Sequence, residues 1–192
     1  MIEITNNKSE EMKKSYLFLA EGFEDIEAIS VVDVLRRGGV EVEMVSITGQ
    51  KQVKSAHGIE VVADRTFEEI KWEEADCLIC PGGMPGAQYL SECSPLLQLL
   101  QQQYESDRLL AAICAAPSIL GHKGLLNNLK ATCFTGFEDD LIGAQVLDKP
   151  VITDKNIITA YGAGAAFDFG FEILSYILGD AVCRNFKKQM RY

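Results

Sequence analysis

The chain has 192 residues, of which 47% are hydrophobic, and carries 18 basic against 28 acidic side chains, a formal net charge of -10. This length and composition suit one buried core, so we expect a single domain over residues 15–192 after a polar leader at residues 1–14. The charge argues against nucleic acid or a membrane surface as a partner, and the lack of a long apolar run or a secretion signal predicts a cytoplasmic protein.

Strand and helix patterns alternate along the chain. In order, they predict a strand at 15–20, a helix at 26–37, a strand at 40–47, a short strand pair within 51–63, a strand at 75–80, a helix at about 87–104, a strand at 108–113, a helix from about 115, a strand at 130–134, a strand pair within 150–160 and a helix at 164–178. The evidence is the spacing of apolar residues, with Gly and Pro at the ends of elements. Such alternation predicts an α/β fold with a mostly parallel sheet covered by helices on both faces.

The sequence contains six cysteines, at positions 77, 80, 93, 114, 133 and 183. In a reducing compartment we expect them to remain thiols. Cys77 and Cys80 form a C-x-x-C pair, but they lie inside an apolar run typical of a buried strand, and no second Cys or His pair at zinc spacing follows. We therefore expect this pair to fill the core, and the sequence predicts no metal site.

Cys114 stands where the predicted strand at 108–113 meets the next helix. Ligands of such folds bind beyond the carboxyl ends of the strands. Pro117 suits the first turn of the helix, and the free N–H groups and dipole at a helix start lower a thiol pKa from about 8.5 to roughly 3.5–7.5. This pattern favours a nucleophile on a strand–turn–helix elbow. The alternative is a small buried cysteine of the core.

Two further turns follow predicted strands. Pro81, Gly82 and Gly83 end one of them, and glycines allow backbone N–H groups to approach and bind an oxyanion. Glu27 begins the helix after the first strand. We expect the three turns to bring together a thiol, an amide cradle and a carboxylate. The alternative for Glu27 is a favourable interaction with the helix dipole.

Several motifs in order carry a resemblance to a known family: "AEGFEDIEAI", "CLICPGGMPGAQYL", "AAICAAPSIL" and "GAGAAFDFGFEIL". Over about residues 20–180 the chain resembles the ThiJ/PfpI family, on the branch of the parkinsonism-linked protein deglycase and its bacterial relatives. The resemblance implies a flavodoxin-like three-layer sandwich and a homodimer with active sites near the subunit interface. It also implies that Cys114 is the reactive cysteine, that protonated Glu27 hydrogen-bonds its thiolate, and that Gly83 and Ala115 present N–H groups to a bound oxygen.

Some positions depart from the family pattern. The protease-like branch has a histidine directly after its cysteine, whereas this chain has Ala115, which argues against peptidase activity. Phe134 stands where some relatives have another histidine, so acid–base work falls mainly on Glu27. His57 resembles a basic residue near the pocket of relatives and is expected to bind substrate or an anion, the alternative being a loop histidine. His122, near the end of the Cys114 helix, is expected to cap it.

The resemblance implies cysteine-dependent processing of 2-oxoaldehydes such as methylglyoxal, or of their adducts on proteins. Cys114 would add to the aldehyde, with Glu27 as the proton shuttle, in a glutathione-independent glyoxalase or a protein deglycase. We expect no cofactor, and a small aldehyde or a glycated protein as partner. The alternative is a redox sensor or holdase chaperone that uses oxidation of Cys114.

Overall fold

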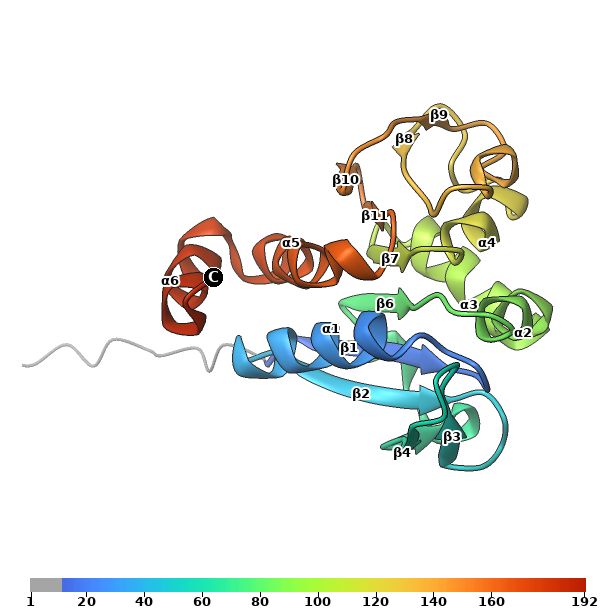
Figure 1. The fold of residues 1–192 in the computed structure, drawn as a ribbon, viewed down its shortest axis with the longest axis horizontal. Helices are drawn as coiled ribbons and strands as arrows, with labels where there is room; N and C mark the ends of the chain where they lie inside the picture. The colour runs from blue at the N-terminus through green and yellow to red at the C-terminus, as the bar shows by residue number, and fades with distance from the viewer. Residues whose placement is uncertain (1–11) are drawn as a thin grey trace, which may run out of the picture.

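The computed structural model describes residues 12–192 (Figure 1). A seven-stranded sheet lies at its centre, in the order β10-β11-β7-β6-β1-β2-β5, and is parallel except for the β10–β11 pair. Its strands are β1 (Lys14–Leu19), β2 (Glu41–Ser46), β5 (Arg65–Thr66), β6 (Cys77–Cys80), β7 (Leu109–Ile113), β10 (Val151–Asp154) and β11 (Ile157–Ala160). Strands β6 and β7 are buried throughout, as expected for parallel strands covered on both faces.

Helices cover both faces of the sheet (Figure 1). On one face lie α1 (Asp25–Arg37) and α5 (Ala166–Leu178), which pack against each other, followed by α6 (Asp180–Met190). On the other face lie α2 (Gly86–Glu92), α3 (Ser94–Glu105) and α4 (Pro117–His122). The α/β class and the three layers predicted from the sequence are thereby confirmed.

Each central strand supplies side chains to two separate cores. On β1, Leu17 and Leu19 pack into the core under α1 and α5, whereas Tyr16 and Phe18 pack into the core under α2, α3 and α4. Successive side chains of a strand point to opposite faces, so a shift by one residue would exchange the two sets. This two-sided burial holds the strand ends in register at the edge of the sheet where the turns meet.

Smaller elements complete the chain. The predicted pair within 51–63 is the hairpin of β3 (Gln52–Lys54) and β4 (Glu60–Val62). The predicted strand at 130–134 is shorter than expected, because only β8 (Lys130–Ala131) forms, and it pairs with β9 (Gln145–Val146) outside the main sheet. Four short 3-10 helices are η1 (Phe67–Glu69), η2 (Trp72–Glu74), η3 (Glu138–Asp140) and η4 (Ala163–Ala165).

The predicted helix at about 87–104 is wrong as a single element, because the chain breaks between α2 and α3 at Cys93, whose ψ of 90° is not helical. Pro95 explains the break, since a proline inside a helix has no N–H to donate and its ring clashes with the carbonyl group four residues earlier. The helix after Cys114 begins at Pro117, later than predicted, and α6 lies beyond the predicted elements.

Two further expectations concern the ends of the chain and the membrane. Of the predicted leader, residues 1–11 lie outside the described residues, and β1 begins at Lys14, inside the predicted leader. Within residues 12–192, no helix combines the length and apolar character needed to span a membrane. Cys77 and Cys80 are buried in β6, which confirms that this pair fills the core.

Candidate active site

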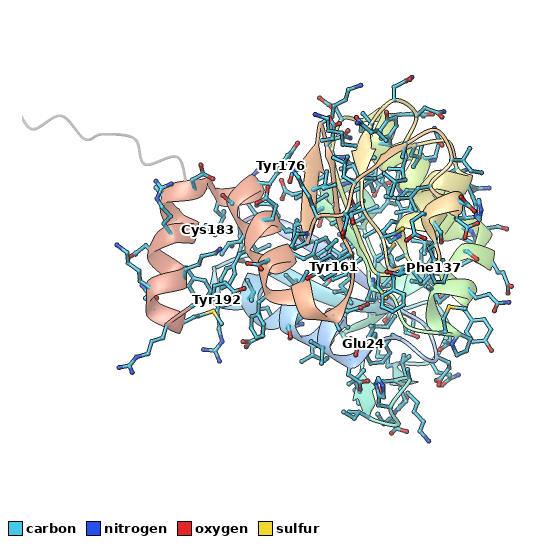
Figure 2. The ribbon with its side chains drawn as sticks, turned by 45° about the horizontal axis from the view of Figure 1, so that its top comes forward. Glu24, Phe137, Tyr161, Tyr176, Cys183 and Tyr192 are labelled. Atoms are coloured by element: carbon cyan, nitrogen blue, oxygen red, sulfur yellow. The ribbon has the colours of Figure 1, made fainter. Side chains whose placement is uncertain are left out.

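The predicted site residues come from three turns at one edge of the sheet. Strands β1, β6 and β7 are adjacent and parallel, so their carboxyl ends meet there. Glu27 lies in the first turn of α1 after β1, Gly82 and Gly83 follow β6, and Cys114 follows β7. Figure 2 shows Cys183 of α6 at the opposite side of the molecule from Phe137, with Tyr161 between them.

Cys114 occupies a sharp turn. Its φ of 65° lies in the left-handed region, which costs a non-glycine residue about 1–3 kcal/mol and persists only when the surroundings impose it. Two backbone hydrogen bonds do so: the Cys114 N–H donates to the carbonyl oxygen of Ala160 (2.9 Å), and the Cys114 carbonyl oxygen accepts from the Phe134 N–H (2.8 Å). The elbow is therefore held from β11 on one side and from the segment after β8 on the other.

Glu27 is a buried carboxyl group, with 1% of its surface exposed. Its Oε2 accepts a hydrogen bond from the Gly82 N–H (2.9 Å), while its own N–H donates to the side chain of Glu24, the N-cap of α1 (2.7 Å). Burial raises the pKa of Glu27 to about 7, against the lowering effect of hydrogen bonds with the Cys114 side chain and the N–H groups of Gly82 and Ala163. A carboxyl group with a pKa near neutrality can both give and take a proton at physiological pH.

The structure reverses the predicted direction for the Cys114 thiol. Burial raises its pKa to about 12, and the carboxylate of Glu27 raises it further than the N–H groups of Gly83 and Ala115 lower it. The predicted lowering by a helix start is wrong because burial and the Glu27 charge dominate, and α4 begins only at Pro117. Protonation of Glu27 removes the repulsion between its carboxylate and the Cys114 thiolate. The thiolate therefore forms mainly when Glu27 is protonated.

The glycines of the Gly82–Gly83 turn have separate parts. A Cβ on Gly82 would lie 2.6 Å from Cys114 Cβ and 2.7 Å from Glu27 Oε2, so only glycine lets these two side chains meet. The sequence analysis expected the Gly82 N–H to bind a substrate oxygen. In the structure this N–H donates to Oε2 of Glu27 instead, so Gly82 holds the carboxyl group in place. The N–H groups of Gly83 and Ala115 are the ones that face the sulfur of Cys114.

The two histidines lie outside this group of contacts. His57 is exposed, and its Nδ1 hydrogen-bonds Oδ2 of Asp25 at the start of α1 (2.7 Å). Glu24, Asp25 and His57 form the one group in the described part of the chain that brings three potential metal ligands within 4.8 Å, but Glu24 already caps the helix and Asp25 already binds His57. His122 lies in the last turn of α4, where its Nε2 hydrogen-bonds Asp140 (3.0 Å).

Residues after β11 also border the site, and the sequence analysis did not identify them. A Cβ on Gly162 would lie 3.2 Å from the ring of Phe134 and 4.0 Å from Oε1 of Glu27, and Ala163 contributes an N–H to Glu27. The glycine-containing run "YGAGAA" directly after a predicted strand was the available signal, because it places a flexible turn at the same edge of the sheet.

Comparison with known proteins shows the family of the chain. The model of the DJ-1/PfpI family matches residues 13–176, most of the chain. The chain belongs to the DJ-1/PfpI family. It is 36% identical over 171 residues to the glutathione-independent glyoxalase DJR-1.2 of Caenorhabditis elegans, covering 87% of this chain and 90% of that protein. It is 37% identical over 178 residues to Protein DJ-1 homolog B of Arabidopsis thaliana, covering 92% of this chain.

The chain spans less than half the length of two Arabidopsis relatives, and it superposes on solved structures of other family members. The chain spans 41% of the length of homolog B and 42% of Protein DJ-1 homolog A of Arabidopsis thaliana. The structure of oxidized Toxoplasma gondii DJ-1 superposes with a TM-score of 0.89 at 30% identity, covering 94% of this chain and 98% of that one. Drosophila melanogaster DJ-1beta gives the same TM-score and identity. These matches confirm the predicted flavodoxin-like fold and the family resemblance.

Proposed function

We propose that this member of the family processes reactive 2-oxoaldehydes such as methylglyoxal, or their adducts on proteins, as a glutathione-independent glyoxalase or deglycase. The observation that carries the proposal is the contact between Cys114 and a buried Glu27 whose pKa is about 7, in a turn where two N–H groups face the sulfur. The relative that is named a glutathione-independent glyoxalase supports the same reaction.

The first step forms a carbon–sulfur bond. The proton of the Cys114 thiol passes to Glu27, and the thiolate adds to the aldehyde carbon. The electron pair of the carbonyl bond moves onto its oxygen, where the N–H groups of Gly83 and Ala115 stabilise the developing charge. Glu27 then returns the proton to this oxygen, which gives a hemithioacetal and leaves Glu27 ionised.

The second step is an intramolecular redox isomerisation of the hemithioacetal. Glu27 removes the hydrogen of the former aldehyde carbon as a proton, and the electron pair of that bond forms an enediol as the proton of the hemithioacetal hydroxyl passes to the neighbouring ketone oxygen. Glu27 then returns its proton to the former ketone carbon, while the first oxygen re-forms its carbonyl bond. The aldehyde carbon is thereby oxidised to a thioester while the ketone is reduced to an alcohol. Water then hydrolyses the thioester, which releases a 2-hydroxy acid and restores the thiol. These reaction steps use no metal, nucleotide or glutathione.

The proposal extends to assembly and location. Ile26 and Ile29 lie one turn apart on α1, close in sequence to Glu27, and have 50% and 41% of their surface exposed. Their exposure supports a homodimer that covers this face of α1 beside the site. Sedimentation of the purified protein tests for the dimer. We place the protein in the cytoplasm, and imaging of a tagged chain tests this.

The redox-sensor alternative is less well supported. A sensor cysteine is typically an exposed thiol of low pKa, whereas burial and Glu27 raise the pKa of Cys114. In the wild type the Glu27 charge is neutralised when it takes up the thiol proton, so the thiolate forms together with proton transfer to Glu27, which is the arrangement that acid–base catalysis on a bound carbonyl uses.

The test is lactate formation from methylglyoxal by purified, reduced protein without glutathione or added metal. We expect turnover by the wild type and its loss in both Cys114→Ser and Glu27→Gln. Circular dichroism of each variant serves as the control for folding. A folded, reduced wild type that forms no lactate and releases no methylglyoxal from a modified peptide would contradict the proposal.

A further inference from the structure

A cleft of about 470 Å³ opens beside the Cys114 elbow, within the range of about 300–1,000 Å³ typical of small-molecule sites. It lies between the segment after β8, the η3 region, the segment after β9 and the residue that follows β11. The side chains that matter to the argument are Cys133, Phe134, Glu138, Asp148 and Tyr161. The family comparison and the proposed mechanism assign no function to this cleft.

The cleft is joined to the reactive pair through the backbone. The N–H of Phe134 donates to the carbonyl oxygen of Cys114, and the N–H of Cys114 donates to Ala160, the residue before Tyr161. Gly162 lies between the ring of Phe134 and the carboxyl group of Glu27, at 3.2 Å and 4.0 Å from its would-be Cβ. A side chain at Gly162 would therefore crowd the ring of Phe134, which lines the cleft, and approach Glu27 of the reactive pair.

One wall of the cleft is apolar. Phe134 is 51% exposed although it is aromatic, and Tyr161 beside it is only partly buried. Burial of such a ring against an apolar group stabilises a complex, and a second aromatic ring adds a favourable ring–ring contact. An aromatic or aliphatic group next to the carbonyl carbons of the substrate fits this wall.

The charged side chains of the cleft are both acidic. Glu138 and Asp148 line it, and among its described lining residues none is Lys, Arg or His. The charge of Glu138 also contributes, after burial, to the raised pKa of Cys133. An anionic group in the cleft would meet two carboxylates and no cation, which disfavours its binding.

We propose that this cleft holds the substituent of the 2-oxoaldehyde and selects uncharged aromatic or aliphatic groups over anionic ones. The inference rests on the proposed function, because Cys114 must hold the aldehyde carbon for the substituent to reach past Gly162. Phe134 and Glu138 are then specificity-determining residues, the first for apolar contact and the second for charge.

The experiment compares three substrates: methylglyoxal, phenylglyoxal and 4-carboxyphenylglyoxal, with kcat/KM measured from formation of the 2-hydroxy acid. For the wild type we expect kcat/KM for phenylglyoxal to exceed that for 4-carboxyphenylglyoxal by about tenfold or more. Glu138→Gln should reduce this ratio several-fold. The amide oxygen of Gln can still accept the hydrogen bond that the Gly136 N–H donates to Glu138, so the loop is preserved.

Asp139→Asn is the matched control. Asp139 is exposed and adjacent to Glu138, and this variant changes the net charge equally, but the residue does not line the cleft. We expect its ratio to equal that of the wild type. In Phe134→Ala, the ratio of kcat/KM for phenylglyoxal to that for methylglyoxal should fall about tenfold, mainly through KM.

The outcomes separate the two proposals. The first outcome is that the protein turns over methylglyoxal, but the ratio of kcat/KM for phenylglyoxal to kcat/KM for 4-carboxyphenylglyoxal is the same in wild type, Glu138→Gln and Asp139→Asn. This result would overturn the selective cleft and leave the proposed function intact. An unchanged phenylglyoxal to methylglyoxal ratio in Phe134→Ala would overturn the apolar wall. No turnover of any of the three substrates would overturn the proposed function, and the inference would fall with it.

Discussion

Replacing Glu27 by Gln should change how the stability of the protein depends on pH. The folded carboxyl group has a pKa of about 7, against an ordinary value of 4.5. Because the pKa is higher in the folded state, protonation of Glu27 stabilises the fold. This contribution to the free energy of unfolding is complete below pH 4.5 and is lost as the pH rises through 7. At about 1.36 kcal/mol per pKa unit, the loss totals about 3 kcal/mol, of which about 2 kcal/mol falls between pH 5.5 and 8.

Gln does not titrate, and its side-chain oxygen can still accept the Gly82 hydrogen bond. The free energy of unfolding of Glu27→Gln, relative to the wild type, should therefore increase by about 2 kcal/mol from pH 5.5 to pH 8. Urea unfolding of the reduced proteins, followed by circular dichroism at several pH values, measures this difference. Glu60→Gln, at an exposed position on β4, controls for the loss of a carboxyl group elsewhere.

The difference between the two unfolding curves isolates Glu27, because every other titrating group is present in both proteins. A difference between wild type and Glu27→Gln that stays constant from pH 5.5 to pH 8, or that matches Glu60→Gln, would refute a Glu27 pKa near 7. The reasoning about its role as a proton shuttle would then lose its electrostatic basis.

Glu27→Gln should speed alkylation of Cys114 by iodoacetamide at pH 8, because the carboxylate that raises the thiol pKa is gone; equal rates by mass spectrometry would contradict this. Gly82→Ala should abolish turnover in a protein that still folds, since its Cβ would lie within 2.7 Å of both reactive side chains; wild-type kcat/KM would show that the contact is not needed. Phe169→Ala should lower the free energy of unfolding by about 3–5 kcal/mol and Phe167→Ala by much less, as measured in urea, because Phe169 is fully buried and Phe167 is 40% exposed; similar losses would refute the packing.

The elements most clearly predicted from sequence were those with local signals. The strand at 15–20, the helix at 26–37 and the strand at 108–113 correspond to β1, α1 and β7 within one or two residues. Their apolar periodicity depends only on neighbours in the chain, so it is visible without tertiary contacts. Parallel pairing then follows from the alternation of strands and helices, and it brings Glu27 and Cys114 to one edge.

Other features were decided by tertiary contacts. The segment at 130–134 has a strand-like composition, but it stays outside the main sheet: only Lys130–Ala131 forms a strand, and Phe134 donates its N–H to the Cys114 carbonyl oxygen instead of extending that strand. The cleft beside it is formed by segments after β8, β9 and β11 that lie far apart in the sequence. No local pattern indicates which of these segments meet.

The reactive pair shows the same division. The local pattern places Cys114 at a strand–helix junction and Glu27 at the start of a helix after a neighbouring strand. The protonation of the pair follows from the three-dimensional fold, because a pKa depends on burial and on charges brought together from distant parts of the chain. Burial and Glu27 raise the pKa of Cys114, contrary to the expectation from its place near a helix start, and burial brings Glu27 to the pH range where a proton shuttle works.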